Sequence, residues 1–109
     1  MKLPNGDRAQ VPLEKLLGYC LNLDHPSGKH KARVFASALS ITAKNAEDLR
    51  ELIQQAAILG EVVQQTTTEH GEVFRVDWAI PNTDTIVLRT LWEIKEANLN
   101  PRLISAFIK

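Results

Sequence analysis

The chain has 109 residues, a length that fits a single domain over residues 1–109 with one hydrophobic core. Thirteen basic residues balance thirteen acidic ones, and a net charge of zero argues against a protein that coats nucleic acid non-specifically. No apolar run approaches the roughly 20 residues that span a bilayer, so no membrane partner is expected. The first residues lack the apolar core of a signal peptide, which predicts a cytoplasmic protein.

Hydrophobic periodicity predicts helices in the first half of the chain. After an extended arm or first edge strand over residues 1–10, Pro12 suits a first helical turn. Asn45 is a suitable cap for a later helix, and Gly60 is a suitable terminator. The predicted helices cover about residues 11–22, 28–39 and 46–59. The single cysteine, Cys20, lies on an apolar helical face and excludes an intrachain disulfide.

After Gly60 the apolar residues alternate, which predicts strands. The predicted strands are Glu61–Glu69, Glu72–Ile80, Thr85–Glu96 and Arg102–Lys109, with turns at 70–71, 81–84 and 98–101. Facing the apolar rows toward one core pairs Trp78 with Leu88 and puts Asp77 opposite Arg89 on the other face. The chain is therefore predicted to be α+β, with N-terminal helices packed on a C-terminal four-stranded antiparallel meander sheet.

The start of the second predicted helix is unusually basic. Lys29, His30, Lys31 and Arg33 occupy its first turns, where the helix dipole favours anions over cations. Lys29 and Arg33 share one flank of the helix, one turn apart, so that both could grip one anion. We therefore expect a phosphate or an acidic partner at this loop-to-helix corner.

The histidines do not form a metal motif. His25 and His30 are five residues apart across a turn, His70 lies in a distant hairpin, and the neighbouring lysines would repel a cation. No nucleophile elbow and no Gly-rich phosphate loop are present. We therefore expect neither a metal nor another cofactor.

Metal-independent cleavage of RNA would use the residue types that remain. It needs an acid, a base and cations around a charged phosphorane-like transition state. His25 or His30 would be the acid or base at neutral pH. Lys29, Lys31 and Arg33 would bind phosphate from the helix, while Arg75 and Arg89 would act from the open sheet face. Thr90, Trp92 or Ser105 would orient or stack the nucleotide. A solvated basic helix start remains the structural alternative.

The stretch from Leu21 to Phe35 carries the pattern Leu-Asn-x-Asp-His-Pro-x-Gly-x-x-Lys-Ala-x-x-Phe, and the chain closes with Arg-Leu-Ile-Ser-Ala-Phe. Together they resemble an uncharacterised bacterial domain family that includes the C-terminal tips of secreted toxins. The order of elements also resembles the barnase, RelE and colicin D group of metal-independent ribonucleases, which are usually held by a cognate antitoxin or immunity protein. The resemblance implies site residues at His25, Lys29, Lys31, Arg89 and Ser105. Relatives often close with Thr-Ala-Tyr, so Phe107 lacks their terminal phenol.

Two hypotheses follow from the sequence. The first is a toxin-like endoribonuclease that acts on RNA and is controlled by a small cognate antitoxin or immunity protein. The second is a non-enzymatic module, homodimeric or monomeric, that docks an acidic partner protein through its basic helix start. The sequence leaves open the RNA substrate, the histidine that acts and whether the chain is catalytic.

Overall fold

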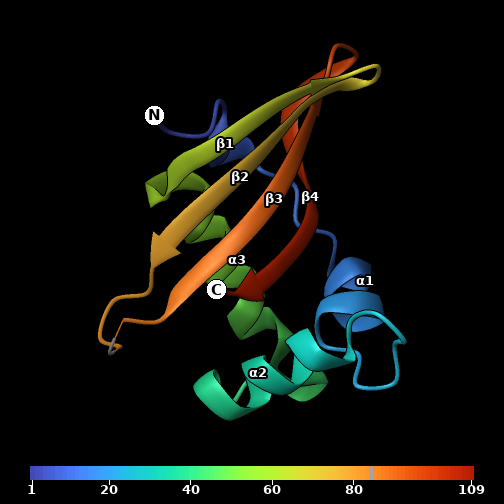
Figure 1. The fold of residues 1–109 in the computed structure, drawn as a ribbon, viewed down its shortest axis with the longest axis vertical. Helices are drawn as coiled ribbons and strands as arrows, with labels where there is room; N and C mark the ends of the chain where they lie inside the picture. Colours follow the sequence, from blue (N-terminus) through green and yellow to red (C-terminus); the bar gives the residue numbers. More distant parts are fainter. Residues whose placement is uncertain (84) are drawn as a thin grey trace.

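The computed structural model describes residues 1–83 and 85–109 and confirms the α+β fold (Figure 1). The elements, in chain order, are η1 (Gly6–Arg8), α1 (Leu13–Lys15), η2 (Leu16–Cys20), α2 (Lys29–Leu39), η3 (Ala43–Asn45), α3 (Ala46–Leu59), β1 (Glu61–Thr68), β2 (Gly71–Ala79), β3 (Val87–Lys95) and β4 (Asn98–Ile108). The strands form one antiparallel sheet in the order β1-β2-β3-β4. No helix in the described part of the chain is long and apolar enough to span a bilayer.

The core lies between α3 and one face of the sheet. Figure 1 shows α3 behind the strands, α1 beside β4, and α2 below the sheet. Leu49 and Ile53 of α3 are fully buried in one cluster with Phe74 and Trp92 of the sheet. We call the sheet face that points away from α3 the open face.

The register of the central strands is the predicted one. Trp78 pairs with Leu88, and Asp77 pairs with Arg89 on the open face. Burial of one face fixes this register, because a slip of one residue would drive Arg89 into the core. Thr90 and Trp92 lie in the buried row and are fully buried, so the prediction that they orient or stack a nucleotide is wrong.

The fourth strand begins earlier than predicted. The turn before it occupies residues 96–97, and residues 98–101, predicted as a turn, are already strand. Pro101 is tolerated there because β4 is an edge strand, where a missing N–H need not break the ladder. Its carbonyl accepts a hydrogen bond from the Gln10 N–H at 2.8 Å. The first ten residues therefore form an extended arm with one short helical turn, and Gln10 bridges Arg102 in parallel.

The helices also differ in detail from the prediction. The first is a single α-turn that continues as a π-turn, ends at Cys20 and leaves Leu17 41% exposed. Asn45 does not cap α3; its side chain accepts the Thr42 N–H at 2.7 Å within a capping box that starts η3. Cys20 is buried as predicted, and this burial raises the pKa of its thiol. The predicted turn at 81–84 includes Asp84, which lies outside the described residues.

Candidate functional site

His25 shapes the loop that precedes α2. Its Nδ1 accepts hydrogen bonds from the backbone N–H groups of Ser27 and Gly28, each at 3.0 Å. The side chain thus satisfies donors at the start of α2, where Gly28 has no side chain to do so. A ring nitrogen that accepts two N–H donors carries no proton, so the Nε2 atom carries it. Only Nε2 of His25 is available for proton transfer.

Tyr19 connects this loop to α2. The rings of Tyr19 and His25 meet edge to face, with centroids 4.8 Å apart. The phenol oxygen accepts a hydrogen bond from Lys31 Nζ at 2.9 Å. Gly28 packs so closely on Tyr19 that an added Cβ would lie 2.6 Å from its carbonyl oxygen. The Gly of the His-Pro-x-Gly motif therefore allows the loop to reach Tyr19.

Lys31 extends from α2 across the end of β4. Its Nζ lies 4.7 Å from the centroid of the Phe107 ring and 5.1 Å from that of Tyr19. Such positions attract an ammonium to the ring electrons by about 0.5–1 kcal/mol at exposed sites. No ion pair to Lys31 occurs among residues 1–83 and 85–109. Lys31 thus presents a positive charge that no carboxylate of the described chain neutralises.

A hollow of about 240 Å³ opens beside Lys31, and we call it the Ser105 hollow. Its lining residues come from α1, η2, α2, β3 and β4: Lys15, Tyr19, Lys31, Leu91, Ile104, Ser105 and Phe107. A bulge at Ile104 shifts the β3–β4 register just before Ser105. Bulges of this kind often re-aim a side chain beside an active site.

Ser105 is the most informative residue of this hollow. Its side chain is only 8% exposed, and its Oγ has no hydrogen-bond partner in the described chain. A buried hydroxyl without a partner costs roughly 1–3 kcal/mol. The position of this hydroxyl, beside a lysine without a counter-ion, is suited to a ligand that accepts hydrogen bonds and carries negative charge.

Arg89 is an ion-paired residue. It makes a two-pronged contact with Asp77, with nitrogen–oxygen distances of 2.7 and 2.8 Å. This hydrogen bonding lowers the pKa of the Asp77 carboxyl and raises that of the Arg89 guanidinium. Lys109 lies 3.5 Å from the same carboxylate. Since Arg89 pairs with Phe107 in the sheet, this charged cluster lies next to the Ser105 hollow.

The remaining predicted site residues lie outside the hollow. Arg75 is on the open face, separated from Ser105 by Leu91, and its buried Nε has no partner among the described residues. His30 and Arg33 are exposed, and Lys29 is half-buried. The structure therefore brings Lys31 and Ser105 together, connects His25 to Lys31 through Tyr19, and leaves the other predicted cations outside the hollow.

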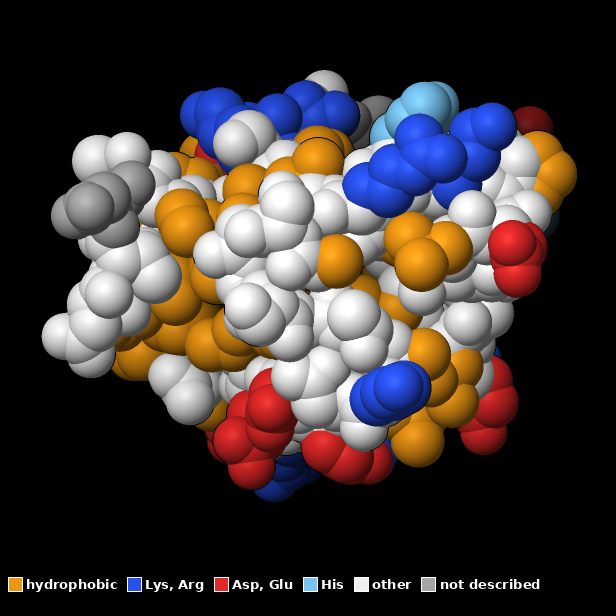
Figure 2. Space-filling model, turned by 90° about the horizontal axis from the view of Figure 1, so that it is seen from below, with side chains coloured by type: hydrophobic (Ala, Val, Ile, Leu, Met, Phe, Trp, Pro, Cys, Tyr) orange, Lys and Arg blue, Asp and Glu red, His pale blue; other side chains and the backbone are white. Residues whose placement is uncertain are grey.

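Charge is unevenly distributed on one face of the molecule although the total is zero. Figure 2 shows Lys and Arg side chains, with a histidine between them, gathered along the upper edge of this face, and Asp and Glu side chains mostly along the lower and right-hand edges, where Lys or Arg side chains also lie. A one-sided basic edge attracts anionic partners more strongly than the net charge suggests.

Sequence reasoning missed Lys15, Tyr19 and Phe107. Nothing in the local pattern identifies Tyr19, because its hydrogen-bond partner Lys31 is 12 positions away and Phe107, which lines the same hollow, is 88 positions away along the chain. The closing Ser-Ala-Phe segment offered the one signal, as a place where relatives carry a phenol. In this chain, Tyr19 supplies a phenol to the same hollow from η2.

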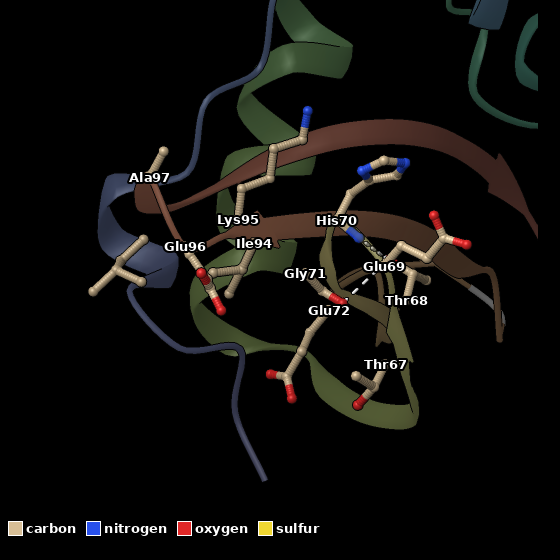
Figure 3. Close-up of a pocket in the computed structure, with 11 residues that line it drawn as sticks. Thr67, Thr68, Glu69, His70, Gly71, Glu72, Ile94, Lys95, Glu96 and Ala97 are labelled. Atoms are coloured by element: carbon tan, nitrogen blue, oxygen red, sulfur yellow. Dashed lines mark hydrogen bonds between the residues drawn. The ribbon is translucent and has the colours of Figure 1, made fainter.

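A larger hollow, of about 570 Å³, lies at the opposite end of the sheet. Figure 3 shows Glu69 and His70 of the β1–β2 turn and Glu72 of β2 beside Lys95 of β3 and Glu96 of the β3–β4 turn, with the Glu69 side chain pointing away from Lys95 and Glu96. Its carboxylates would repel phosphate. No group of three or more His, Cys, Asp or Glu side chains suited to a metal occurs in the described part of the chain.

Comparison with known proteins identifies the family. Residues 2–109 match a domain of unknown function, DUF6883, and the chain belongs to that family. A search of curated proteins finds no match. The fold is similar to that of a chain in a contact-dependent growth inhibition toxin–immunity protein complex from Klebsiella pneumoniae 342, with a TM-score of 0.70 and 17% identity. The match covers 91% of this chain and 98% of that one. At this identity the likeness shows a shared fold.

Proposed function

We propose that this member of the DUF6883 family is a toxin-like, metal-independent endoribonuclease whose cleavage centre is the Ser105 hollow. One observation carries the proposal: Ser105, whose buried Oγ has no hydrogen-bond partner in the described chain, lines the same hollow as Lys31, which has no counter-ion among the described residues. A phosphodiester would satisfy both groups at once, because its oxygens accept hydrogen bonds and carry negative charge.

Each residue at the hollow has a role in this proposal. Lys31 and Lys15 stabilise the charge that develops on the phosphoryl oxygens, and Ser105 donates a hydrogen bond to one of them. Lys31 is the donor in its bond with Tyr19, so the phenol keeps its own proton free to donate. His25 is the favoured general acid, donating the proton on Nε2, because its ring touches Tyr19. His30, which is exposed, is the alternative.

The surrounding cations would bind the rest of the RNA. Lys29 and Arg33 on α2 and Arg75 on the open face would contact flanking phosphates. Arg89, ion-paired with Asp77, would support the site from the neighbouring strand, where it pairs with Phe107.

A cognate partner protein is part of this proposal. The structural neighbour is a toxin–immunity complex, and the basic edge in Figure 2 is suited to an acidic inhibitor. We place both proteins in the bacterial cytoplasm, where RNA is available. An inhibitor bound over the Ser105 hollow would block RNA by competing for the same cations.

A second candidate function is a non-enzymatic module that docks an acidic protein through the same basic edge. Two observations favour this module. The Arg89 guanidinium is already ion-paired with Asp77, and the Nδ1 atom of His25 already accepts backbone hydrogen bonds, so neither group is free for catalysis. Growth arrest on expression that Lys31→Ala relieves would favour the enzyme. Harmless expression, with retained binding to an acidic partner, would favour the module.

The decisive experiment is incubation of purified protein with RNA in EDTA. We expect cleavage by the wild type, at least about 100-fold slower cleavage by Lys31→Ala, and unchanged cleavage by the control Lys44→Ala. Lys44 is an exposed lysine of η3 outside the Ser105 hollow. RNA that stays intact after long incubation at high protein concentration would contradict the proposal.

A further inference from the structure

The two outer edges of the sheet differ in how far other backbone segments pair with them. At β4, Gln10 pairs with the edge through the bonds Gln10 N–Pro101 O at 2.8 Å and Leu103 N–Gln10 O at 3.0 Å. At β1, the one backbone bond to the outer side among the described residues joins Val62 N to Met1 O. Residues 63–68 are exposed along their whole length. This part of β1 therefore presents an uncovered strand edge.

The sequence of this edge lacks the usual protection. Residues Val62–Thr68 contain no charge, proline or glycine and are Val, Gln and Thr only. Natural proteins protect exposed edges with lysine, proline or short strands, because an open edge pairs with other strands. Here the register shift between Val62 and Gln64 is the one such device, and it lies at the start of the strand.

We propose that β1 pairs with β1 of a second copy of this chain, antiparallel and centred on Thr66. A partner recognised by charge would need charges to face, and residues 62–68 offer none. A second copy presents the same uncharged edge and is complementary to it.

The charges at the ends of β1 select the register. A dimer centred on Gln65 would place Glu61 opposite Glu69 of the second copy at both ends, which is unfavourable. A dimer centred on Thr66 removes this opposition, since Val63 then faces Glu69 of the second copy. Thr66 faces itself across the twofold axis.

Such a dimer leaves the basic site free. The strand order places β4, which lines the Ser105 hollow, at the opposite edge of the sheet from β1. The two four-stranded sheets would join along β1, with both hollows at the outer ends. The dimer is therefore independent of the proposed ribonuclease function.

Sedimentation equilibrium over a range up to about 1 mM, where weak dimers still form, tests association directly. We expect a monomer–dimer equilibrium that Thr66→Lys weakens about tenfold or more, because two lysines would then lie directly opposite each other. Gln55→Lys, an exposed change on α3, should leave association unchanged. A monomer throughout the range, or equal association by both variants, would overturn the proposal.

Disulfide trapping tests the register. Thr66→Cys should form a covalent dimer on mild oxidation, because its two copies face each other across the axis. Thr68→Cys, on the same strand and also exposed, should not, since it would face Gln64 of the second copy. Cys20 is buried and should not react. Cross-linking by Thr68→Cys as efficient as that by Thr66→Cys would refute the Thr66-centred pairing. A chain that pairs with a foreign strand peptide but does not associate with itself would also refute the proposal.

Discussion

Lys31 Nζ donates a hydrogen bond to the phenol oxygen of Tyr19 at 2.9 Å, and this bond joins α2 to η2 at the mouth of the Ser105 hollow. The lysine also lies over the ring of Phe107 from β4. Two helical segments and one strand thus meet at a single positive charge.

Tyr19→Phe should separate the role of the phenol hydroxyl from that of the aromatic ring. The aromatic contacts with His25 and Lys31 would remain, so the unfolding temperature should change little. Loss of the proton donor should slow RNA cleavage about 100-fold, the scale of general acid catalysis. Cleavage assays with thermal unfolding would measure both effects. Full activity in Tyr19→Phe would remove the phenol from the mechanism.

Ser105→Ala should affect stability and activity in opposite directions. It removes a buried hydroxyl that lacks a partner among the described residues, so the free energy of unfolding should stay equal or rise by up to about 1 kcal/mol. Cleavage should fall about tenfold or more with the loss of one donor to the phosphate. Urea unfolding and single-turnover cleavage are the measurements.

The matched control for Ser105→Ala is Thr90→Val, at a buried hydroxyl that is fully bonded. Thr90 Oγ1 accepts from Trp92 Nε1 at 2.7 Å and donates to Val76 O at 3.3 Å. Its removal should lower the free energy of unfolding by about 1–3 kcal/mol, because the indole N–H loses its acceptor. Equal destabilisation by the two variants would show that Ser105 has a hidden structural partner.

Substitution of His25 and of His30, the two histidines near the start of α2, should have different effects on stability and cleavage. His25→Ala removes the acceptor of two backbone N–H groups and should cost about 1 kcal/mol, as loss of a helix cap does. It should also reduce cleavage, whereas His30→Ala should change neither stability nor activity by much. Chemical unfolding and RNA cleavage of both variants test this. The reverse ranking in cleavage would transfer the acid–base role to His30.

Asp77→Asn should change how stability depends on pH. The pKa of Asp77 is lowered in the folded chain, chiefly by hydrogen bonding to Arg89. The ionised Asp77 carboxylate therefore adds to the free energy of unfolding. This contribution is fully present above the pKa of the unfolded chain, near 3.9, and is lost as pH falls through the lower pKa of the folded chain. The variant should be less stable at neutral pH, by about 1–3 kcal/mol, and should lose less stability on acidification below about pH 4.

Urea titrations of wild type and Asp77→Asn from neutral to acid pH would measure this difference. Lys109→Ala is the control, because its contact with Asp77 is long and its side chain is 55% exposed, so it should have little effect. Parallel pH profiles for wild type and Asp77→Asn would argue that the ion pair with Arg89 adds no stability.

The sheet was predictable from the sequence because its signal is local. Alternation over β2 and β3 identifies the buried row, and burial of one face leaves one register, so the Asp77–Arg89 pair follows. Local signals failed at β4, where Pro101 suggested a turn. The bridge to Gln10, a residue far away along the chain, keeps Pro101 in the edge strand.

The amino-acid sequence by itself determined the α+β class, the core register and the basic start of α2, because helical and strand periodicity and charge spacing are properties of neighbouring residues. Only the tertiary structure decided that Lys31, Tyr19 and Ser105 share one hollow and that Arg89 is neutralised by Asp77. Packing of η2 and α2 against β4 joins residues up to 88 positions apart, and no local pattern specifies such contacts.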